Sequence, residues 1–335
     1  MPVVLGIETS CDETAAAVVD ENFHVISTVV ESSINLHRDF GGVVPELAGR
    51  AHVTTLGPVI SRALKEAGLD QHYPAIDAIA VTSGPGLIGS LLVGLSAAKA
   101  YAMAWDVPFV GVNHLEGHLF APLLEQPDLQ WPLLTLLVSG GHSLIVLQRG
   151  PGQHEVLGET IDDAAGEAYD KIARWLGLGY PGGPEIDRLA QTGTAGMLKL
   201  PVSMSGTDFD LSFSGLKTAV VRATQKHAEV GLVDVAASFQ AAVCEQLLRK
   251  LRGAMEKYEV KGVALAGGVA ANSLLRARVQ DLASEFAVAC HLPTLAMCTD
   301  NAAMIAAAGL YRLGASGPSS LNLPANPNWQ LADVS

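Results

Sequence analysis

The sequence lacks the features that mark secreted proteins. Its 335 residues include four cysteines (Cys11, Cys244, Cys290 and Cys298), and no two of them form a Cys-x-x-Cys pair. No basic leader precedes the first apolar strand pattern, which begins near the N-terminus. A signal peptide is therefore not expected, and the sequence predicts reduced thiols in a cytoplasmic protein.

Positive charge is scarce, and so are apolar runs without charge. The chain has 21 Lys and Arg residues against 34 Asp and Glu residues, a net charge of −13. This balance argues against broad, nonspecific nucleic-acid binding but leaves room for a local basic patch. One stretch, residues 86–105, imitates a membrane span but contains Lys99. A lysine in the middle of a span is costly in lipid, so we expect a buried helix and no membrane association.

Several familiar site motifs are also absent. The chain has no G-x-x-x-x-G-K-[ST] loop, because the segment SGPGLIGS, residues 83–90, lacks the lysine of such a loop. The zinc-protease pattern H-E-x-x-H is missing too, because residues 114–118 read H-L-E-G-H. The general base of such a protease directly follows the first histidine, whereas this glutamate comes one place later. A metalloprotease is therefore disfavoured.

The elements that are present form two similar blocks. Apolar residues make up 49% of the chain, as in a globular protein. Residues 3–30 are typical of three short strands joined by tight turns, and residues 133–160 repeat the plan. Helical patterns follow each block, at 45–68, 87–104, 162–176, 184–191, 215–228 and 233–257. This pattern predicts a duplicated α/β unit with the crossing near residues 124–132 and a ligand site in the cleft between the halves.

Two histidines stand where an α/β sheet often holds a ligand. A strand ends at Asn113, which can cap a helix that starts at His114, with Glu116 completing a capping box. His114 and His118 lie one helical turn apart on the same face, beyond the carboxyl end of a strand. This spacing predicts a metal pair, with a helix surface as the alternative.

A third ligand is available before the alanine-rich helix that follows residue 300. Asp300 is either the N-cap of that helix or a metal ligand, and the sequence does not choose between the two. Two imidazoles and one carboxylate suit Fe(II) or Zn(II) with positions left open for substrate.

Polar and glycine-rich turns open each half. "TSCDET" and "VSGGHS" are hairpin turns whose backbone N–H groups can cradle phosphate oxygens, and "LAGGVAANSLLR" places Gly267 and Gly268 between a strand and a helix. Helix starts attract anions, and three further segments supply the candidates Asp170, Gly183, Asp187 and Lys217. Solvated helix faces remain the alternative for these residues.

Together these stretches resemble one family. "GIETSCDET", "VTSGPGLIGSLLVG", "NHLEGHL", "LLVSGGH", "IDDAAGEAYDK", "YPGGP", "FSGLKT", "AGGVAAN" and "CTDNAAMIA" are similar to motifs of the TsaD family, from about residue 3 to about residue 313. These are tRNA N6-adenosine threonylcarbamoyltransferases, formerly labelled O-sialoglycoprotein endopeptidases or glycoproteases.

The resemblance implies an α/β fold of the actin-like ATPase (ASKHA) superfold. Two similar lobes would each hold a mixed sheet with flanking helices, and the active site would lie in the cleft between them. Residues 1–128 plus 306–335 would form the N-terminal lobe, with the first phosphate hairpin and the metal helix. Residues 129–305 would form the C-terminal lobe, with the second phosphate hairpin and the nucleotide site.

The resemblance also implies ligands. One divalent metal per subunit, with Fe2+ favoured over Zn2+ or Mg2+, would be held by His114, His118 and Asp300. Threonylcarbamoyl-AMP or ATP would be the bound nucleotide. Its binding residues would be Leu137, Val138, Ser139, Gly140, Gly141, Asp170, Gly183, Asp187 and Asn272, with His142, Gly267, Gly268 and Lys217 as further candidates.

The implied reaction is transfer of the threonylcarbamoyl group from threonylcarbamoyl-AMP to N6 of adenosine 37, in tRNAs that read codons beginning with A. AMP is released. The implied partners are tRNA, a shorter inactive paralog (TsaB-like) that forms a heterodimer, and a small ATPase (TsaE-like). A TsaC-type enzyme would supply the adenylate. Because the net charge is −13, we expect weak, steeply salt-dependent tRNA binding by this chain alone.

An exocyclic adenine amine is a poor nucleophile, so proton removal should matter. Asp12, at the tip of the first hairpin, is our candidate base, and Glu13 is the alternative. A small-molecule or sugar kinase of the same superfold is the rival hypothesis, although a kinase would not need two histidines at its metal.

Overall fold

A computed structural model describes residues 2–202 and 208–334. The chain divides into two compact units, Met1–Leu129 with Thr299–Ser335 (the first unit) and Gln130–Cys298 (the second unit). Each unit has its own buried hydrophobic cluster. The sequence placed the return to the first lobe at residue 306, whereas residues 299–305 already group with the first unit. The reason is that α10 (Ala302–Ser316) packs against β1 (Val3–Glu8) from its first turn.

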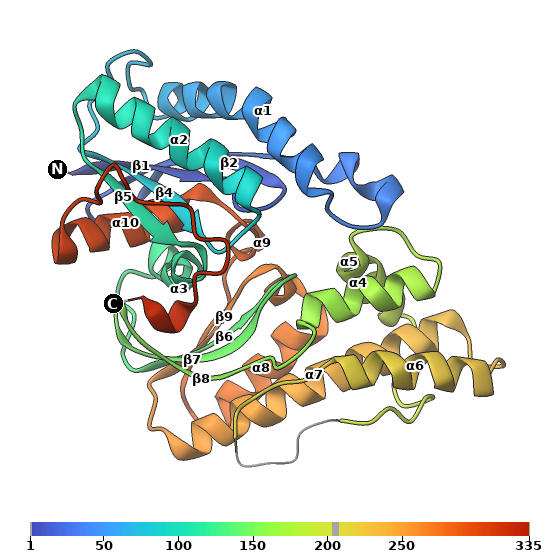
Figure 1. Cartoon of the computed structure of the whole chain (residues 1–335). Coiled ribbons are helices and arrows are strands. Elements are labelled where there is room, and N and C mark those ends of the chain that lie inside the picture. The colour runs from blue at the N-terminus through green and yellow to red at the C-terminus, as the bar shows by residue number, and fades with distance from the viewer. Residues whose placement is uncertain (1, 203–207, 335) are drawn as a thin grey trace. The chain divides into compact units, whose positions relative to one another are not determined.

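The first unit is a five-stranded mixed sheet with helices on both faces. Its strand order is β3-β2-β1-β4-β5, with the first three strands antiparallel and the last three parallel. Helices α1 and α2 cover one face, and α3 and α10 cover the other (Figure 1). The remaining elements are β2 (Glu13–Asp20), β3 (Val25–Ser32), β4 (Ala78–Gly84), β5 (Phe109–Asn113), α1 (Pro45–Glu66), α2 (Ile88–Trp105), α3 (His114–Glu125), η1 (Ile34–Leu36), η2 (Arg38–Phe40) and η4 (Leu331–Asp333).

The second unit repeats this sheet. Its order is β10-β9-β6-β7-β8, again with an antiparallel meander followed by parallel strands. Helices α7 and α8 pack on the sheet, and α4 and α5 pack together with α5 against α7. The elements are β6 (Leu133–Val138), β7 (Ser143–Gly150), β8 (Gln153–Glu159), β9 (Gly262–Ala266), β10 (Ala289–His291), α4 (Ala165–Trp175), α5 (Gly182–Ala190), α6 (Ser214–Lys226), α7 (Leu232–Lys257), η3 (Gly268–Ala271), α8 (Ser273–Glu285) and α9 (Leu295–Cys298). The prediction of a duplicated α/β unit is confirmed.

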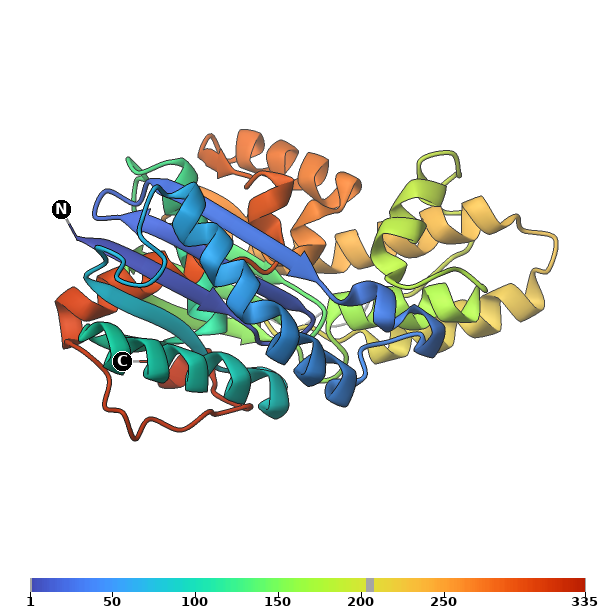
Figure 2. The same cartoon turned by 90° about the horizontal axis from the view of Figure 1, so that it is seen from above.

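Helix α2 is the one helix of the described chain that is long and apolar enough to cross a membrane, by length and composition only. It lies beside α1 over the sheet (Figure 2), with Leu91 and Leu95 buried and Leu92 about half exposed. The sequence predicted a buried helix, whereas only one side of α2 is covered. Lys99 reaches the tail that follows α10, where its Nζ donates to the Leu323 carbonyl oxygen at 2.6 Å.

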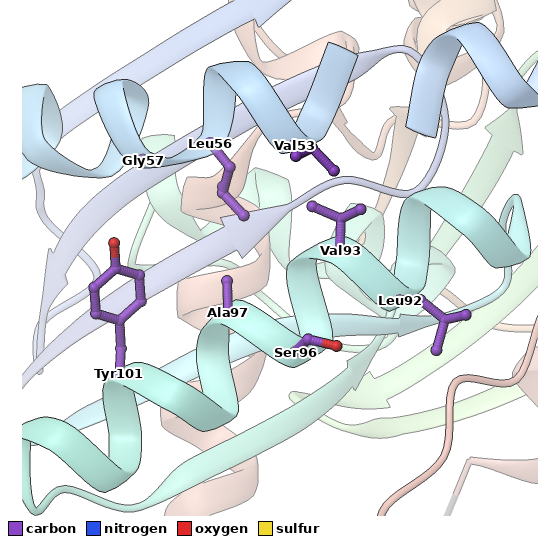
Figure 3. A pocket seen from close by; sticks show the side chains of 8 residues that line it. All are labelled: Val53, Leu56, Gly57, Leu92, Val93, Ser96, Ala97 and Tyr101. Carbon is purple, nitrogen blue, oxygen red and sulfur yellow. The ribbon is translucent and has the colours of Figure 1, made fainter. Parts of the chain in front are cut away.

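A groove of about 430 Å3 separates parts of α1 and α2 (Figure 3). Leu56 lies at its floor, while Val53 and Leu92 are 68% and 49% exposed. No charged side chain lines it, and Gly57 leaves open space where another residue would place a Cβ atom. The first unit therefore presents an apolar helix pair to its surroundings.

Candidate active site

The histidine pair is held by a capped helix. Asn113 ends β5, and its side-chain oxygen accepts hydrogen bonds from the backbone N–H groups of Leu115 and Glu116, at 2.9 and 3.3 Å. The cap is therefore present as predicted. The Glu116 carboxylate, however, pairs with Arg312 of α10 instead of closing a capping box, so it ties the two helices together.

Asp300 is not the cap of the helix that follows it. Asn301 has that role, because its side-chain oxygen accepts from the Met304 N–H at 3.0 Å. Gly117 lets α3 and α10 approach closely, since a Cβ there would lie 2.7 Å from Ile305 Cδ1. The close approach brings Asp300 to the histidines, and its carboxylate is left available to them.

The three side chains converge. Asp300 Oδ1 lies 3.4 Å from His114 Nε2 and 3.2 Å from His118 Nε2. The two rings meet edge to face, with centroids 4.8 Å apart. Both histidines are buried, and Asp300 is partly exposed. All three belong to the first unit, so this cluster is complete within one body.

The electrostatics of the cluster are strongly coupled. Burial disfavours a charged His114 ring, yet Asp300 and Glu8 raise its pKa well above the ordinary value. Burial likewise opposes ionisation of Asp300, but the charge and hydrogen bonds of His114 and His118 hold its pKa below the usual range. The site therefore stabilises positive charge beside these carboxylates.

Glu8 belongs to the site, and sequence analysis missed it. Its side chain is completely buried at the end of β1, and its Oε2 lies 3.0 Å from His114 Nδ1. The signal was available, because a charge at the end of an apolar strand is seldom buried without a partner. Sequence analysis instead selected Asp12 and Glu13, which lie in the turn after this strand.

The tip of the first hairpin, formed by Asp12 and Glu13, interacts electrostatically with Asp300. Asp12 is 8% exposed, and its Oδ2 is buried without a hydrogen-bond partner among the described residues. Burial, followed by the charges of Asp300 and Asp12, raises the pKa of Glu13 to about 9. Asp12 therefore has a free acceptor atom, whereas Glu13 holds its proton at neutral pH.

The cluster has the composition and size of a metal site. One ligand atom from each of His114, His118 and Asp300 lies within 4.8 Å of the other two. Ligand atoms about 2.1 Å from a shared ion stand roughly 3–4 Å apart. His118 Nδ1 is buried without a partner among the described residues, so no second hydrogen bond fixes that ring. These residues can hold a divalent cation.

The second unit carries the glycine hairpin. Its turn is closed by the Ser139 N–H, which donates to the His142 carbonyl oxygen at 2.8 Å. Cβ atoms added at Gly140, Gly141, Gly183 or Gly268 would meet nothing within 4 Å. The backbone at these positions is therefore accessible to a ligand.

Two other glycines have packing roles around that hairpin. Gly267 has a φ of +85°, and a Cβ there would clash with the Val138 carbonyl oxygen. Gly166 packs on Ser139 in the same manner at the start of α4. The ends of β6 and β9 and the start of α4 therefore meet at the glycine hairpin.

Asp187 and Asn272 lie in one hydrogen-bond network. Asp187 Oδ1 accepts from Ser273 Oγ at 2.7 Å, Gln240 Nε2 at 3.0 Å and Asn272 Nδ2 at 3.3 Å. Asn272 also donates to Gln240 Oε1 at 3.0 Å and caps α8 through the Leu275 N–H. Gln240 is a second residue that sequence analysis missed, because a lone glutamine within a helix gives no signal.

Three predictions take a different form in the structure. The side chains of Leu137 and Val138 are fully buried, so these residues can offer a ligand only backbone groups. Asp170 accepts from the Gly182 N–H at 2.7 Å and so anchors the start of α5, next to Gly183. Lys217 lies on α6 and, in the described part of the chain, is not linked to the Asp187 network.

Two similar α/β units, each with a meander followed by parallel strands, define an actin-like ATPase fold. HypF from T. kodakarensis shares this fold, with a TM-score of 0.64 and 16% identity over 93% of this chain and 48% of that chain. The model of the TsaD family, tRNA N6-adenosine threonylcarbamoyltransferase, matches residues 24–307.

Relatives with that same name cover nearly the whole chain. The protein of Syntrophomonas wolfei is 50% identical over 330 residues, which is 97% of both chains. That of Bacillus thuringiensis is 52% identical over 331 residues, 97% of this chain and 95% of its own. The chain belongs to the tRNA N6-adenosine threonylcarbamoyltransferase family. It is an acyltransferase of tRNA modification, as the resemblance predicted.

Proposed function

We propose that the chain transfers the threonylcarbamoyl group of threonylcarbamoyl-AMP to N6 of adenosine 37, in tRNAs that read codons beginning with A. The bond between the carbamoyl carbon and the phosphate oxygen breaks, and AMP leaves with that oxygen. The new bond joins the carbamoyl carbon to N6, which loses one proton. The observation that carries the proposal is the convergence of His114 Nε2 and His118 Nε2 on Asp300.

In this proposal His114, His118 and Asp300 hold one divalent metal, Fe2+ before Zn2+ or Mg2+. The donor set of two imidazoles and a carboxylate supports this assignment. When bound, the metal supplies a Lewis acid for a phosphate or carbonyl oxygen of the donor. The three residues would hold the positive charge of the metal next to the carboxylates of Asp300 and Glu8.

The second unit receives the nucleotide. The backbone N–H groups of Gly140 and Gly141 lie in a turn without side chains, which suits close contact with an anionic group, whereas the Ser139 N–H is used to close the turn. Asp187 and Asn272 are held in place by Gln240 and Ser273 before any ligand arrives. Such preorganisation lowers the cost of orienting a ligand, and hydroxyl groups of a ribose are the natural partners of this polar frame.

Asp12 removes the proton from N6. Its buried Oδ2 has no partner among the described residues, so an acceptor atom is free. Glu13 is less suited, because burial raises its pKa and its Oε1 already accepts a hydrogen bond from Ser32 Oγ at 3.1 Å. A base matched to its task contributes roughly 100- to 10,000-fold in rate.

A single-turnover assay with pre-formed threonylcarbamoyl-AMP, tRNA and metal-loaded protein tests this function. The parent should form labelled product and AMP in equal amounts, and Asp12→Asn should be at least about 100-fold slower. Asp39→Asn, an exposed aspartate, is the matched control. Normal transfer by Asp12→Asn at saturating substrate would remove Asp12 from the mechanism. ATP-dependent phosphorylation of a small molecule without transfer would favour the kinase alternative.

The tRNA contacts α6. This helix carries Lys217, Arg222 and Lys226 and no acidic residue, and none of the three belongs to an ion pair within the described residues. By contrast, Lys171 and Lys250 are paired with carboxylates. An unneutralised helix gives a locally basic surface on an acidic protein, which suits weak, salt-dependent contact with phosphates.

A shorter paralog docks on the α1–α2 groove, and a small ATPase and an adenylate-forming enzyme complete the system. The groove is apolar and open, which suits an amphipathic helix of the paralog. Leu92→Asp should weaken the heterodimer at least tenfold in analytical ultracentrifugation. Met103→Asp, on the same helix, exposed and outside the groove, is the control. Equal effects of the two variants would place the paralog elsewhere.

A further inference from the structure

The carboxylate of Glu8 is buried at the end of β1 and makes three polar contacts. Its Oε1 accepts from the Ser10 N–H, and its Oε2 accepts from Thr82 Oγ1 and faces His114 Nδ1. None of these contacts reaches solvent, because Glu8 is 0% exposed. Nothing in the proposed transfer reaction uses this side chain directly.

We propose that Glu8 is a positioning residue for the metal cluster: it fixes the His114 ring with Nε2 toward Asp300 and so strengthens binding of a divalent metal. This inference rests on the proposed function, because it assumes that His114, His118 and Asp300 hold a metal. It adds a residue of β1 to a site that is otherwise built from α3 and the segment before α10.

The hydrogen-bond pattern determines the orientation of the ring. A carboxylate only accepts hydrogen bonds, so His114 Nδ1 donates to Glu8 Oε2 at 3.0 Å. In the neutral ring, the lone pair then lies on Nε2, which is 3.4 Å from Asp300 Oδ1. Without metal, a proton on Nε2 fills this position; a divalent metal that replaces the proton uses the same lone pair beside the Asp300 carboxylate. Ser10 Oγ, at 3.3 Å from Nδ1, is the other polar neighbour.

The second histidine lacks such a support. His118 Nδ1 is buried and has no hydrogen-bond partner among the described residues. His114 is therefore the ring with a charged partner on its Nδ1 atom, whereas His118 contacts a carboxylate only through Nε2 within the described residues. Outer carboxylates of this kind typically change metal affinity by about 10- to 100-fold when they are removed.

Glu8→Gln tests the inference, because Gln has a similar shape but cannot accept all three contacts as a carboxylate does. The measurement is the dissociation constant for Zn2+, by competition with a chromophoric chelator on the full chain. The absorption spectrum of bound Co2+ provides a second readout of the ligand geometry. We expect Glu8→Gln to bind Zn2+ about 10- to 100-fold more weakly, with an altered Co2+ spectrum.

Glu116→Gln is the matched control. Glu116 is equally buried and lies between the two histidines in the sequence, yet it pairs with Arg312. We expect its Zn2+ affinity to stay within threefold of the parent. Equal affinities of Glu8→Gln and the parent would overturn the inference, and so would equal losses in both variants, which would indicate a general packing effect.

A second variant decides the outcome if Glu8→Gln fails to fold in chelator, as judged by circular dichroism. Thr82→Val keeps the Glu8 carboxylate but removes the hydroxyl that holds Oε2 at 2.5 Å. It should weaken Zn2+ binding about three- to tenfold, and unchanged binding would overturn the inference. If the parent binds no Zn2+, or if His118→Ala binds Zn2+ as tightly as the parent, the metal part of the proposed function fails as well. If the parent binds and transfers normally, only the role of Glu8 is at stake.

Discussion

The two units build the same sheet but different polar clusters. In the first unit, Glu8, His114, His118 and Asp300 bring charges together, and buried atoms of Asp12 and His118 stay without partners among the described residues. In the second unit, Asp187, Gln240, Asn272 and Ser273 bond one another. Buried charge is costly unless it is compensated. In the proposed function the first cluster is completed by a bound metal, whereas the polar groups of the second bond one another within the chain.

The largest effect should follow from Asp300→Asn, which changes one of the three residues proposed to hold the metal. Metal content should fall from one per chain to near zero, and transfer should fall more than about 100-fold, beyond the usual effect of an outer residue. Elemental analysis and the single-turnover assay measure the two quantities. Asp39→Asn should match the parent. Full metal content in Asp300→Asn would mean that the cluster has another purpose.

Asp187→Ala probes the complete cluster and should act on folding as well as on binding. Four hydrogen bonds lose their acceptor, one each from Gln240 and Asn272 and two from Ser273. Ser273 is exposed to water and Asn272 Nδ2 keeps Gln240 Oε1 as an acceptor, so the main loss falls on the buried Gln240. Leaving one buried polar group unsatisfied costs about 1–3 kcal/mol. We therefore expect a loss of about 2 kcal/mol in urea unfolding, with weaker AMP binding. Asp281→Ala, an exposed change on α8, is the control. If Asp187→Ala has the same free energy of unfolding as the parent, the hydrogen bonds of the second cluster do not stabilise the fold, and the proposed difference between the two clusters is wrong.

Glu13→Gln probes the first unit through the pH dependence of its free energy of unfolding. The folded pKa of Glu13 is about 9, against an ordinary value of 4.5. Between these values the folded chain holds a proton that the unfolded chain has lost, so the free energy of unfolding decreases as pH rises through this window. In chelator, the decrease from pH 5 to pH 9 should be smaller in Glu13→Gln than in the parent. Glu21→Gln, at an exposed glutamate, serves as the control. If the free energy of unfolding depends on pH in the same way in Glu13→Gln and in the parent, the raised pKa of Glu13 is contradicted.

The sequence predicted most of this arrangement because its signals were local. Strand–turn–strand patterns predicted both meanders, and the spacing of His114 and His118 predicted one helical face. The candidate third ligand could be chosen only from the fold, since Asp300 lies 182 residues from His118 in the sequence. Its competing role as a helix cap is excluded because Asn301 caps α10.

The sequence could not predict which polar side chains that lie far apart in the chain form hydrogen bonds with each other. Glu8 and His114 are 106 residues apart, and Gln240 and Asp187 are 53 residues apart. No pattern of period two or 3.6 records such a contact, because it arises from the packing of separate elements. The α2 surface was misjudged for a related reason: composition showed an apolar helix, but only the fold shows which side is covered.

The smallest effect should come from α6, which lies outside both clusters in the described part of the chain. Each phosphate contact changes the slope of log affinity against log salt by about 0.9. Lys226→Ala should therefore weaken tRNA binding a few-fold at low salt and reduce this slope by about 0.9, without changing metal content or unfolding free energy. Lys65→Ala on α1 is the matched control, since that lysine also lies in the last turn of its helix. If filter binding at several salt concentrations gives the same slope for both variants and the parent, the tRNA contacts another surface, and the acid-free face of α6 is an ordinary solvated helix.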